Sequence, residues 1–270
     1  MNIYKRELRA HRKSLIIWSV SMFLLIVGGM GKYSASIGAG AGSFNELIAQ
    51  MPKSLQNLMG VGVFDFSNAM DYFGILFLYL ALMAAVHAVM LGSGIIAKEE
   101  RDKTVEFLMV KPVSRAKIVT SKLLAALTII IIFNLATLVS SYSMLSYYSK
   151  NEPFVAGLFK LMAALLCIQI LFVVIGAFFA AVINKPKLSS AAATSVMLIM
   201  YMVSIIIDLG KNIDFLRFFT IFKYFDSKLI LKHVLFQNYD IAVYSIISAV
   251  LLASCVFGTY YFYKKRDLKI

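Results

Sequence analysis

The sequence lacks the motifs that identify common classes of enzyme. It contains no Walker A loop (GxxxxGK[ST]), no HExxH zinc motif and no GxSxG nucleophile motif. Its histidines, His11, His87 and His233, lie far apart in the sequence and lack the spacing of that zinc motif. Its two cysteines, Cys167 and Cys255, form neither a CxxC motif nor a disulfide framework. We therefore expect no catalytic, cofactor-binding or metal-binding residues on this chain.

Charged residues are also scarce, and long parts of the chain have none. Apolar residues make up 60% of the 270 residues, whereas soluble domains contain about 45–50%. A membrane span needs roughly 20 helical residues, and no ten-residue alternation suggests a β-barrel. The predicted fold is an all-α integral membrane protein, a single domain over 1–270 with six transmembrane helices. The spans are expected at 14–30, 72–96, 123–148, 161–183, 188–207 and 241–263.

The charge that is present is mostly positive, with a net value of +13. No segment is long enough to form a basic soluble face, so we expect anionic lipid headgroups and no nucleic acid as partners. With both termini in the cytoplasm, the inner segments hold 18 of the 27 Lys and Arg residues. That asymmetry predicts a multi-pass protein of the cell membrane with cytoplasmic termini.

Two segments outside the spans are expected to form helices at the membrane surface. Residues 1–13 place three apolar side chains on one face among basic ones, which predicts an interfacial helix; a solvated basic tail is the alternative. Residues 208–240 are too charged to span the membrane, but carry apolar side chains at helical spacing. We expect this segment to lie in the outer interface or to re-enter the membrane under cover of neighbouring helices. The residues at helical spacing are Phe218, Phe222, Phe225 and Leu229.

The spans contain almost no ionisable side chains, and His87 is their one imidazole. Asn134 and Gln169 are the other large polar side chains. They either line a transport pathway or hydrogen-bond between helices. Because proton relays and ion paths need charged residues within the spans, this composition argues against a proton-coupled transporter.

Charge is concentrated between the second and third spans, in the loop 97–122. The stretch KEERDKTVEFLMVKPVSRAKIVTSK holds seven basic and four acidic residues. Glu99 and Lys103 have the i,i+4 spacing of a helical ion pair, and the helix should end near Met109, ahead of a Lys-Pro pair. Ser114 is the predicted N-cap of the next helix. The apolar VEFLM stretch rimmed by charge indicates a docking surface for a soluble partner; a solvated loop is the alternative.

Residues 95–124 resemble the signature segment of the permease subunits of type-2 ATP-binding-cassette exporters. That pattern has a Glu after the second span, then roughly Gly-Thr-x-Glu-x-Leu-Leu, Pro-Val-Ser-Arg, and a Lys opening the third span. Lys103 stands where glycine is usual, and Met109 replaces a leucine. The resemblance is weaker at FKYFD, residues 222–226. The residues that match are Glu100, Thr104, Glu106, Leu108, Pro112, Val113, Ser114, Arg115 and Lys122.

The resemblance implies a function as the transmembrane subunit of a bacterial exporter. The loop would be a coupling helix that docks on a separate cytoplasmic ATPase subunit, which binds ATP and Mg. Two permease chains, identical or different, would pair with two ATPase chains. The docking residues would be Glu99, Glu100, Arg101, Thr104, Glu106, Phe107, Leu108, Pro112, Val113, Ser114 and Arg115.

Two other functions remain open on the sequence. One is a membrane-embedded assembly or sensor subunit that docks a soluble partner without transporting anything. The other is a secondary transporter or channel, which would need a polar or charged stripe along its spans.

Overall fold

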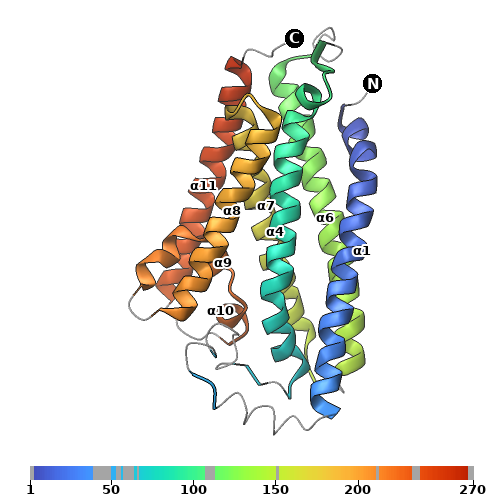
Figure 1. Cartoon of the computed structure of the whole chain (residues 1–270), viewed down its shortest axis with the longest axis vertical. Helices are drawn as coiled ribbons and strands as arrows, with labels where there is room; N and C mark the ends of the chain where they lie inside the picture. The colour runs from blue at the N-terminus through green and yellow to red at the C-terminus, as the bar shows by residue number, and fades with distance from the viewer. Residues whose placement is uncertain are drawn as a thin grey trace.

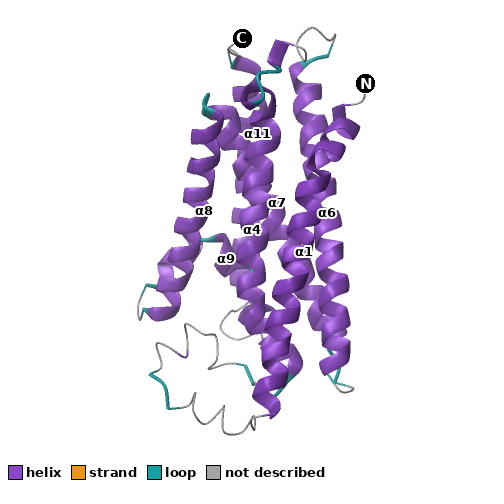
Figure 2. Cartoon of the chain, turned by 45° about the vertical axis from the view of Figure 1, so that its right-hand side comes forward, coloured by secondary structure: helices purple, strands orange, loops and turns teal. Residues whose placement is uncertain are grey.

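The computed structural model describes residues 3–38, 50–52, 56, 64–65, 67–106, 113–149, 152–210, 213–232 and 238–266. All regular elements in these ranges are helices, and the long ones run side by side in one bundle (Figures 1 and 2). Three short helices precede the last long one: η1 (Asp214–Phe219), α9 (Ile221–Tyr224) and α10 (Ser227–Lys232). The long helices are α1 (Ile3–Gly38), α4 (Ala69–Arg101), α6 (Arg115–Tyr148), α7 (Val155–Val182), α8 (Pro186–Leu209) and α11 (Asn238–Lys265).

Six helices in the described part of the chain are long and apolar enough to cross a membrane. They correspond one to one to the predicted spans, and most extend beyond them. α4, for example, has 33 residues, a length of about 50 Å against a hydrocarbon core of about 30 Å. Its charged last turn lies beyond the apolar stretch. The six-helix prediction is confirmed, and the charged residues next to the spans prove to be helical too.

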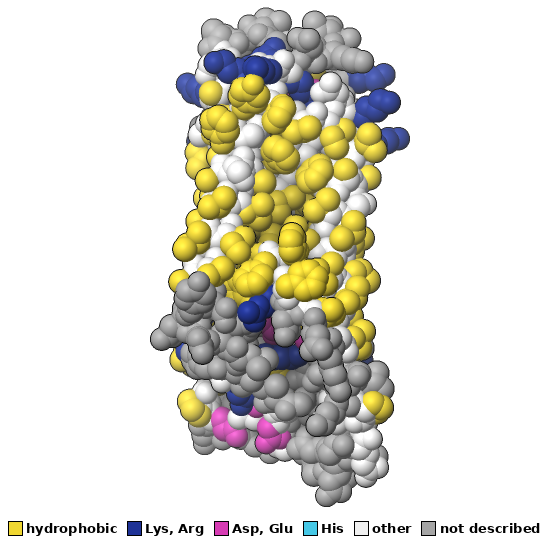
Figure 3. Space-filling view, turned by 90° about the vertical axis from the view of Figure 1, so that its left-hand side faces the viewer, with side chains coloured by type: hydrophobic (Ala, Val, Ile, Leu, Met, Phe, Trp, Pro, Cys, Tyr) yellow, Lys and Arg dark blue, Asp and Glu magenta, His cyan; other side chains and the backbone are white. Residues whose placement is uncertain are grey.

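Both chain termini lie at the same end of the bundle (Figure 1). We call this the terminal end, where α4 finishes and α6 and α8 begin; the opposite end, which carries η1 and α10, is the distal end. Figure 3 shows a broad belt of hydrophobic side chains across the middle of one face, with lysine and arginine side chains at the terminal end and others, together with acidic side chains, toward the distal end. This distribution suits a bundle surrounded by lipid, with basic residues at headgroup level.

α4 and α7 form the buried centre of the bundle, and they approach closely at a pair of glycines. A Cβ atom added at Gly92 of α4 would overlap the carbonyl of Val173, and one at Gly176 of α7 would overlap the carbonyl of Val89. Small residues at a helix crossing allow the two backbones to pack directly against each other, which is a common source of stability inside membranes.

The structure corrects the two helices expected next to the spans at the terminal end. Residues 3–13 do not form a separate helix, because α1 continues without interruption from Ile3 to Gly38. The helix expected to reach Met109 is interrupted: α4 ends at Arg101, with Asp102 as its C-cap, and the chain is helical again at Val105 and Glu106. Residues 107–112, including Met109, lie outside the described residues. Ser114 is the N-cap of α6, as predicted: its Oγ accepts a hydrogen bond from the Lys117 amide at 3.3 Å.

Residues 213–232 fold as three short helices instead of one amphipathic helix. Thr220 donates a hydrogen bond to the Met200 carbonyl at 2.7 Å. Met200 lies about 13 Å before the end of α8 at Leu209, so the chain folds back along this helix over that distance. Phe222 packs between Phe172 and Tyr201, with both ring pairs at 5.4 Å. The predicted helical face is divided accordingly: Phe222 and Leu229 are buried, whereas Phe218 lies at the surface. We call residues 213–232 the return segment.

Candidate functional site

At the terminal end, Lys122 of α6 occupies a fully buried position. Its Nζ forms an ion pair with Glu99 of α4 and donates to the Ile95 and Ile96 carbonyls at 2.6 Å and 3.3 Å. A buried ammonium is tolerated only where such partners replace its hydration. Glu99 is itself 5% exposed, so this predicted docking carboxylate is directed into the bundle.

The same carboxylate also connects α4 to α1. Arg6 donates to Glu99 at 2.5 Å and to Glu7 at 2.8 Å. Glu7 is fully buried and accepts from Lys98 at 3.0 Å. We call these four residues, together with Lys122, the terminal ion-pair network. Basic and acidic side chains alternate along it in the order Lys98, Glu7, Arg6, Glu99 and Lys122. The network attaches the N-terminal parts of α1 and α6 to the last turn of α4.

Glu100, the next residue along, reaches the opposite side of the bundle. It forms an ion pair with Arg266, which follows α11 and also donates to the Ala180 carbonyl at 2.5 Å and the Ile183 carbonyl at 3.2 Å. Arg115, at the start of α6, donates to the carbonyls of Lys264 at 2.9 Å and Arg266 at 2.6 Å. Glu100 and Arg115, one on each side of the loop, therefore both bind the end of α11. The positive charge of Arg115 also interacts favourably with the negative end of the α11 helix dipole.

The remaining predicted docking residues divide into three groups. Arg101, Thr104 and Glu106 are exposed at the terminal end. Val113 is half-buried against the core, and Ser114 is exposed as the helix cap. The other three lie outside the described residues: Phe107, Leu108 and Pro112.

Lys103 shows why the expected helical pair with Glu99 does not form. Its φ is 53°, in the left-handed region that non-glycine residues avoid. The Thr104 amide donates back to the Glu99 carbonyl at 2.8 Å, and the Lys103 amide donates to Glu100 at 3.4 Å. The chain therefore turns immediately after α4. Glycine, which is usual here in the signature that this segment resembles, suits this conformation better than lysine.

Asn134 and Gln169 meet between α6 and α7 in the middle of the bundle. The Asn134 amide donates to the Gln169 side-chain oxygen at 3.3 Å and to the Met162 carbonyl at 3.2 Å. Gln169 is fully buried and Asn134 is 8% exposed. This arrangement agrees with the helix-packing alternative, since the two side chains face each other within one chain.

A second group of charges lies at the distal end, which we call the distal ion-pair cluster: Asp208, Lys223, Asp226 and Lys228. Lys223 is buried and contacts Asp208 at 2.7 Å and Asp226 at 3.1 Å. Lys228 lies 3.5 Å from Asp208. The cluster joins the last turn of α8 to the return segment with two acids and two bases.

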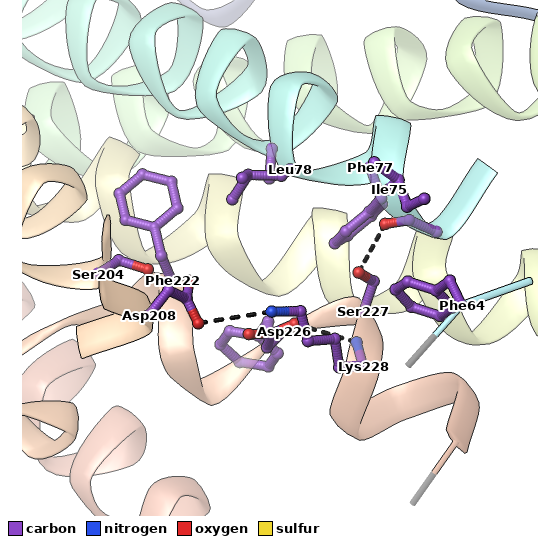
Figure 4. Close-up of a pocket in the computed structure, with 13 residues that line it drawn as sticks. Phe64, Ile75, Phe77, Leu78, Ser204, Asp208, Phe222, Asp226, Ser227 and Lys228 are labelled. Carbon is purple, nitrogen blue, oxygen red and sulfur yellow. Dashed lines mark hydrogen bonds and ion pairs between the residues drawn. The ribbon is translucent and has the colours of Figure 1, made fainter. Parts of the chain in front are cut away.

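Figure 4 shows part of this cluster bordering a cavity of about 30 Å³, the size of a water molecule. Ser227 donates to the Gly74 carbonyl at 2.6 Å and so attaches the return segment to α4. Burial opposes the charge on Lys223, but Asp226 and Asp208 outweigh it and raise its pKa above the ordinary value. Burial similarly opposes ionisation of Asp226, yet Lys223 and Lys228 lower its pKa. Both groups are therefore charged near neutral pH.

Sequence reasoning missed several partners in these networks. Arg6 and Glu7 lie in the segment predicted as an interfacial helix or, alternatively, a solvated basic tail. Arg266 was considered only as one of the positive charges near the C-terminus. Glu7 was a usable signal, because it is the one acid among the first 13 residues, which also hold five Lys and Arg residues as possible ion-pair partners. Nothing in the sequence pairs Arg266 with Glu100.

Comparison with known proteins identifies the family of this arrangement. No curated protein matches the chain. A family model described as ABC-2 family transporter protein matches residues 1–268, which is nearly the whole chain and includes the segment whose signature we recognised. The six apolar helices agree with a transmembrane subunit of a transporter. The chain belongs to the ABC-2 transporter family.

Proposed function

We propose that this chain is the permease subunit of an exporter and that it couples to a separate ATPase through residues 98–115. One observation carries the proposal: the end of α4 that exposes Arg101 and Thr104 is bound by buried ion pairs to three other parts of the bundle. Glu99 binds α1 and α6, and Glu100 binds the residue after α11. A force applied to the exposed turn would therefore reach most of the bundle at once.

The ATPase would bind ATP and Mg, since the sequence of this chain has no Walker A loop. A second permease chain, identical or different, would complete the membrane part. The terminal end would face the cytoplasm of a cell membrane, because the segments at this end hold 18 of the 27 Lys and Arg residues. The return segment would then close the outer end of the pathway, held to α8 by the distal ion-pair cluster.

The test is to purify the tagged chain from its native membrane and to identify soluble partners by mass spectrometry. The informative variants are Arg101→Glu and Glu106→Lys, since both side chains are exposed. Glu100→Lys is less informative because it also breaks the pair with Arg266. Glu152→Lys, an exposed acid at the distal end, is the matched control.

We expect an ATPase of cassette size with the wild type and the control, and its loss with the two loop variants. An ATPase that stays bound to both loop variants would contradict docking at this segment. A soluble partner without ATPase activity would favour the sensor or assembly function instead. Substrate-stimulated ATP hydrolysis by the reconstituted complex distinguishes transport from docking alone.

A further inference from the structure

A groove runs along the side of the bundle between α7 and α11. It consists of two adjoining cavities of about 530 Å³ and 220 Å³, which share Ile170 and Leu252 in their walls. The larger cavity occupies the distal half, where Tyr224 and Phe225 of the return segment border it. The smaller one continues toward the terminal end between α6, α7 and α11.

The size and lining of the larger cavity fit an unbranched hydrocarbon chain. Most of its walls are alanine, leucine, isoleucine and phenylalanine side chains. Along α7 it extends from Lys160 to Leu171, about 16 Å, or half of a hydrocarbon core of about 30 Å. The cavity is therefore about one leaflet deep, the depth that one acyl chain of a phospholipid spans.

Lys160 places a positive charge at the mouth of this cavity. Its side chain is exposed, and none of the ion pairs among the described residues involves it. The uncharged stretch of α7 begins at the next residue, Leu161, so the ammonium lies where the apolar span meets the headgroup layer. A lysine at this depth attracts the phosphates of anionic lipids.

We propose that the α7–α11 groove binds one acyl chain of an anionic phospholipid, with the lipid phosphate at Lys160. The acyl chain would lie in the larger cavity against Phe225. Phe225 also borders the water-sized cavity beside Asp208 and Asp226. A bound lipid thus supports the return segment from the side opposite to its ion pairs. The proposal concerns this chain alone and does not depend on docking of an ATPase.

The experiment measures lipid binding to the purified, delipidated full-length chain by native mass spectrometry. Phosphatidylglycerol and phosphatidylcholine with the same acyl chains are titrated separately, so that the headgroup is the sole difference. Lys160→Gln removes the charge, and Ala249→Phe fills the groove from α11. The matched controls are Lys32→Gln, an exposed lysine near the distal end of α1, and Ala191→Phe, on the exposed face of α8.

We expect the wild type and both controls to retain one tightly bound phosphatidylglycerol per chain. Lys160→Gln should weaken phosphatidylglycerol about fivefold, the effect of one lysine near a membrane surface, and leave phosphatidylcholine unchanged. Ala249→Phe should lose the tight site for both lipids. Equal phosphatidylglycerol binding by the wild type and Lys160→Gln, or an intact tight site in Ala249→Phe, would overturn the proposal. Helical circular dichroism verifies that each variant is folded.

Discussion

Glu100 and Arg266 form an ion pair although 166 residues separate them in the chain. Arg266 is 6% exposed, and its guanidinium also donates to the carbonyls of Ala180 and Ile183. One side chain therefore holds together the end of α4, the end of α7 and the residue after α11. The C-terminal end of the bundle is thus fastened directly to the turn that we propose as the ATPase contact.

Replacing Arg266 by alanine should destabilise the protein by about 3 kcal/mol, because Glu100 and two carbonyls lose a buried partner. The measurement is thermal unfolding in detergent. Lys265→Ala is the control, since Lys265 is exposed and its Nζ contacts Tyr261 of its own helix. Arg266→Lys should recover only part of the loss, because an ammonium lacks the planar fork of a guanidinium. Equal melting temperatures for Arg266→Ala and Lys265→Ala would show that this pair is not stabilising.

Replacing Gly92 by alanine should separate α4 from α7, because the new methyl group would overlap the Val173 backbone. Overpacking in a core costs about 1–3 kcal/mol, and a backbone neighbour leaves little room for adjustment. Gly94→Ala is the matched control two residues away, where nothing lies within 4 Å of the added carbon. Urea or heat titrations should show a lower midpoint for Gly92→Ala alone. A similar midpoint for the two variants would contradict the close crossing.

Replacing Lys103 by glycine should stabilise the turn after α4, by about 1 kcal/mol, because glycine adopts a φ of 53° without strain. Asp102→Gly tests the same change one residue earlier, where φ is −89°. That control should bring no gain, since its backbone angle is ordinary for any residue. The measurement is the melting temperature of each variant. A higher melting temperature for Asp102→Gly, with no change for Lys103→Gly, would show that the backbone at Lys103 is not strained.

Replacing Lys223 by methionine should loosen the return segment by about 3 kcal/mol, because Asp208 and Asp226 would lose their buried partner. Limited proteolysis of reconstituted protein, with cleavage sites located by mass spectrometry, should detect faster cutting within residues 213–232. The double variant Lys223→Met/Asp226→Asn should be cut more slowly than the single one, since it removes one unpaired charge. Faster cutting of the double variant would argue against the pairing.

The distal ion-pair cluster should also confer a defined pH dependence. The pKa of Lys223 is raised above 10.5, so its stabilisation is present below that pH and lost as pH rises through the raised value. The pKa of Asp226 is lowered below 3.8, so its stabilisation is present above that pH and lost as pH falls through the lowered value. Proteolysis with acid- and alkali-tolerant proteases should therefore find a protected segment between about pH 4 and 10. In Lys223→Met, the rate of proteolysis should no longer rise at alkaline pH, because methionine has no proton to lose.

Much of the fold could be predicted because a bilayer imposes one simple requirement. Backbone groups in lipid must be satisfied within the segment, so each long uncharged stretch had to be a helix. The cap at Ser114 was equally local, since it depends on a few neighbouring residues. The break after Arg101 was not predictable in this way: the Glu99–Lys103 spacing favoured a continuing helix, and the turn at Lys103 opposed it.

The sequence by itself determined a six-helix membrane bundle, its central charged loop and the family resemblance, because apolar length and local motifs are readable along the chain. Only the tertiary structure decided which charges are exposed and which are buried. Glu99 and Arg101 are two residues apart, yet one lies in the bundle against Lys122 and the other faces outward. That difference depends on the packing of α1, α6 and the end of α11 around α4, which joins residues 23 to 166 positions apart.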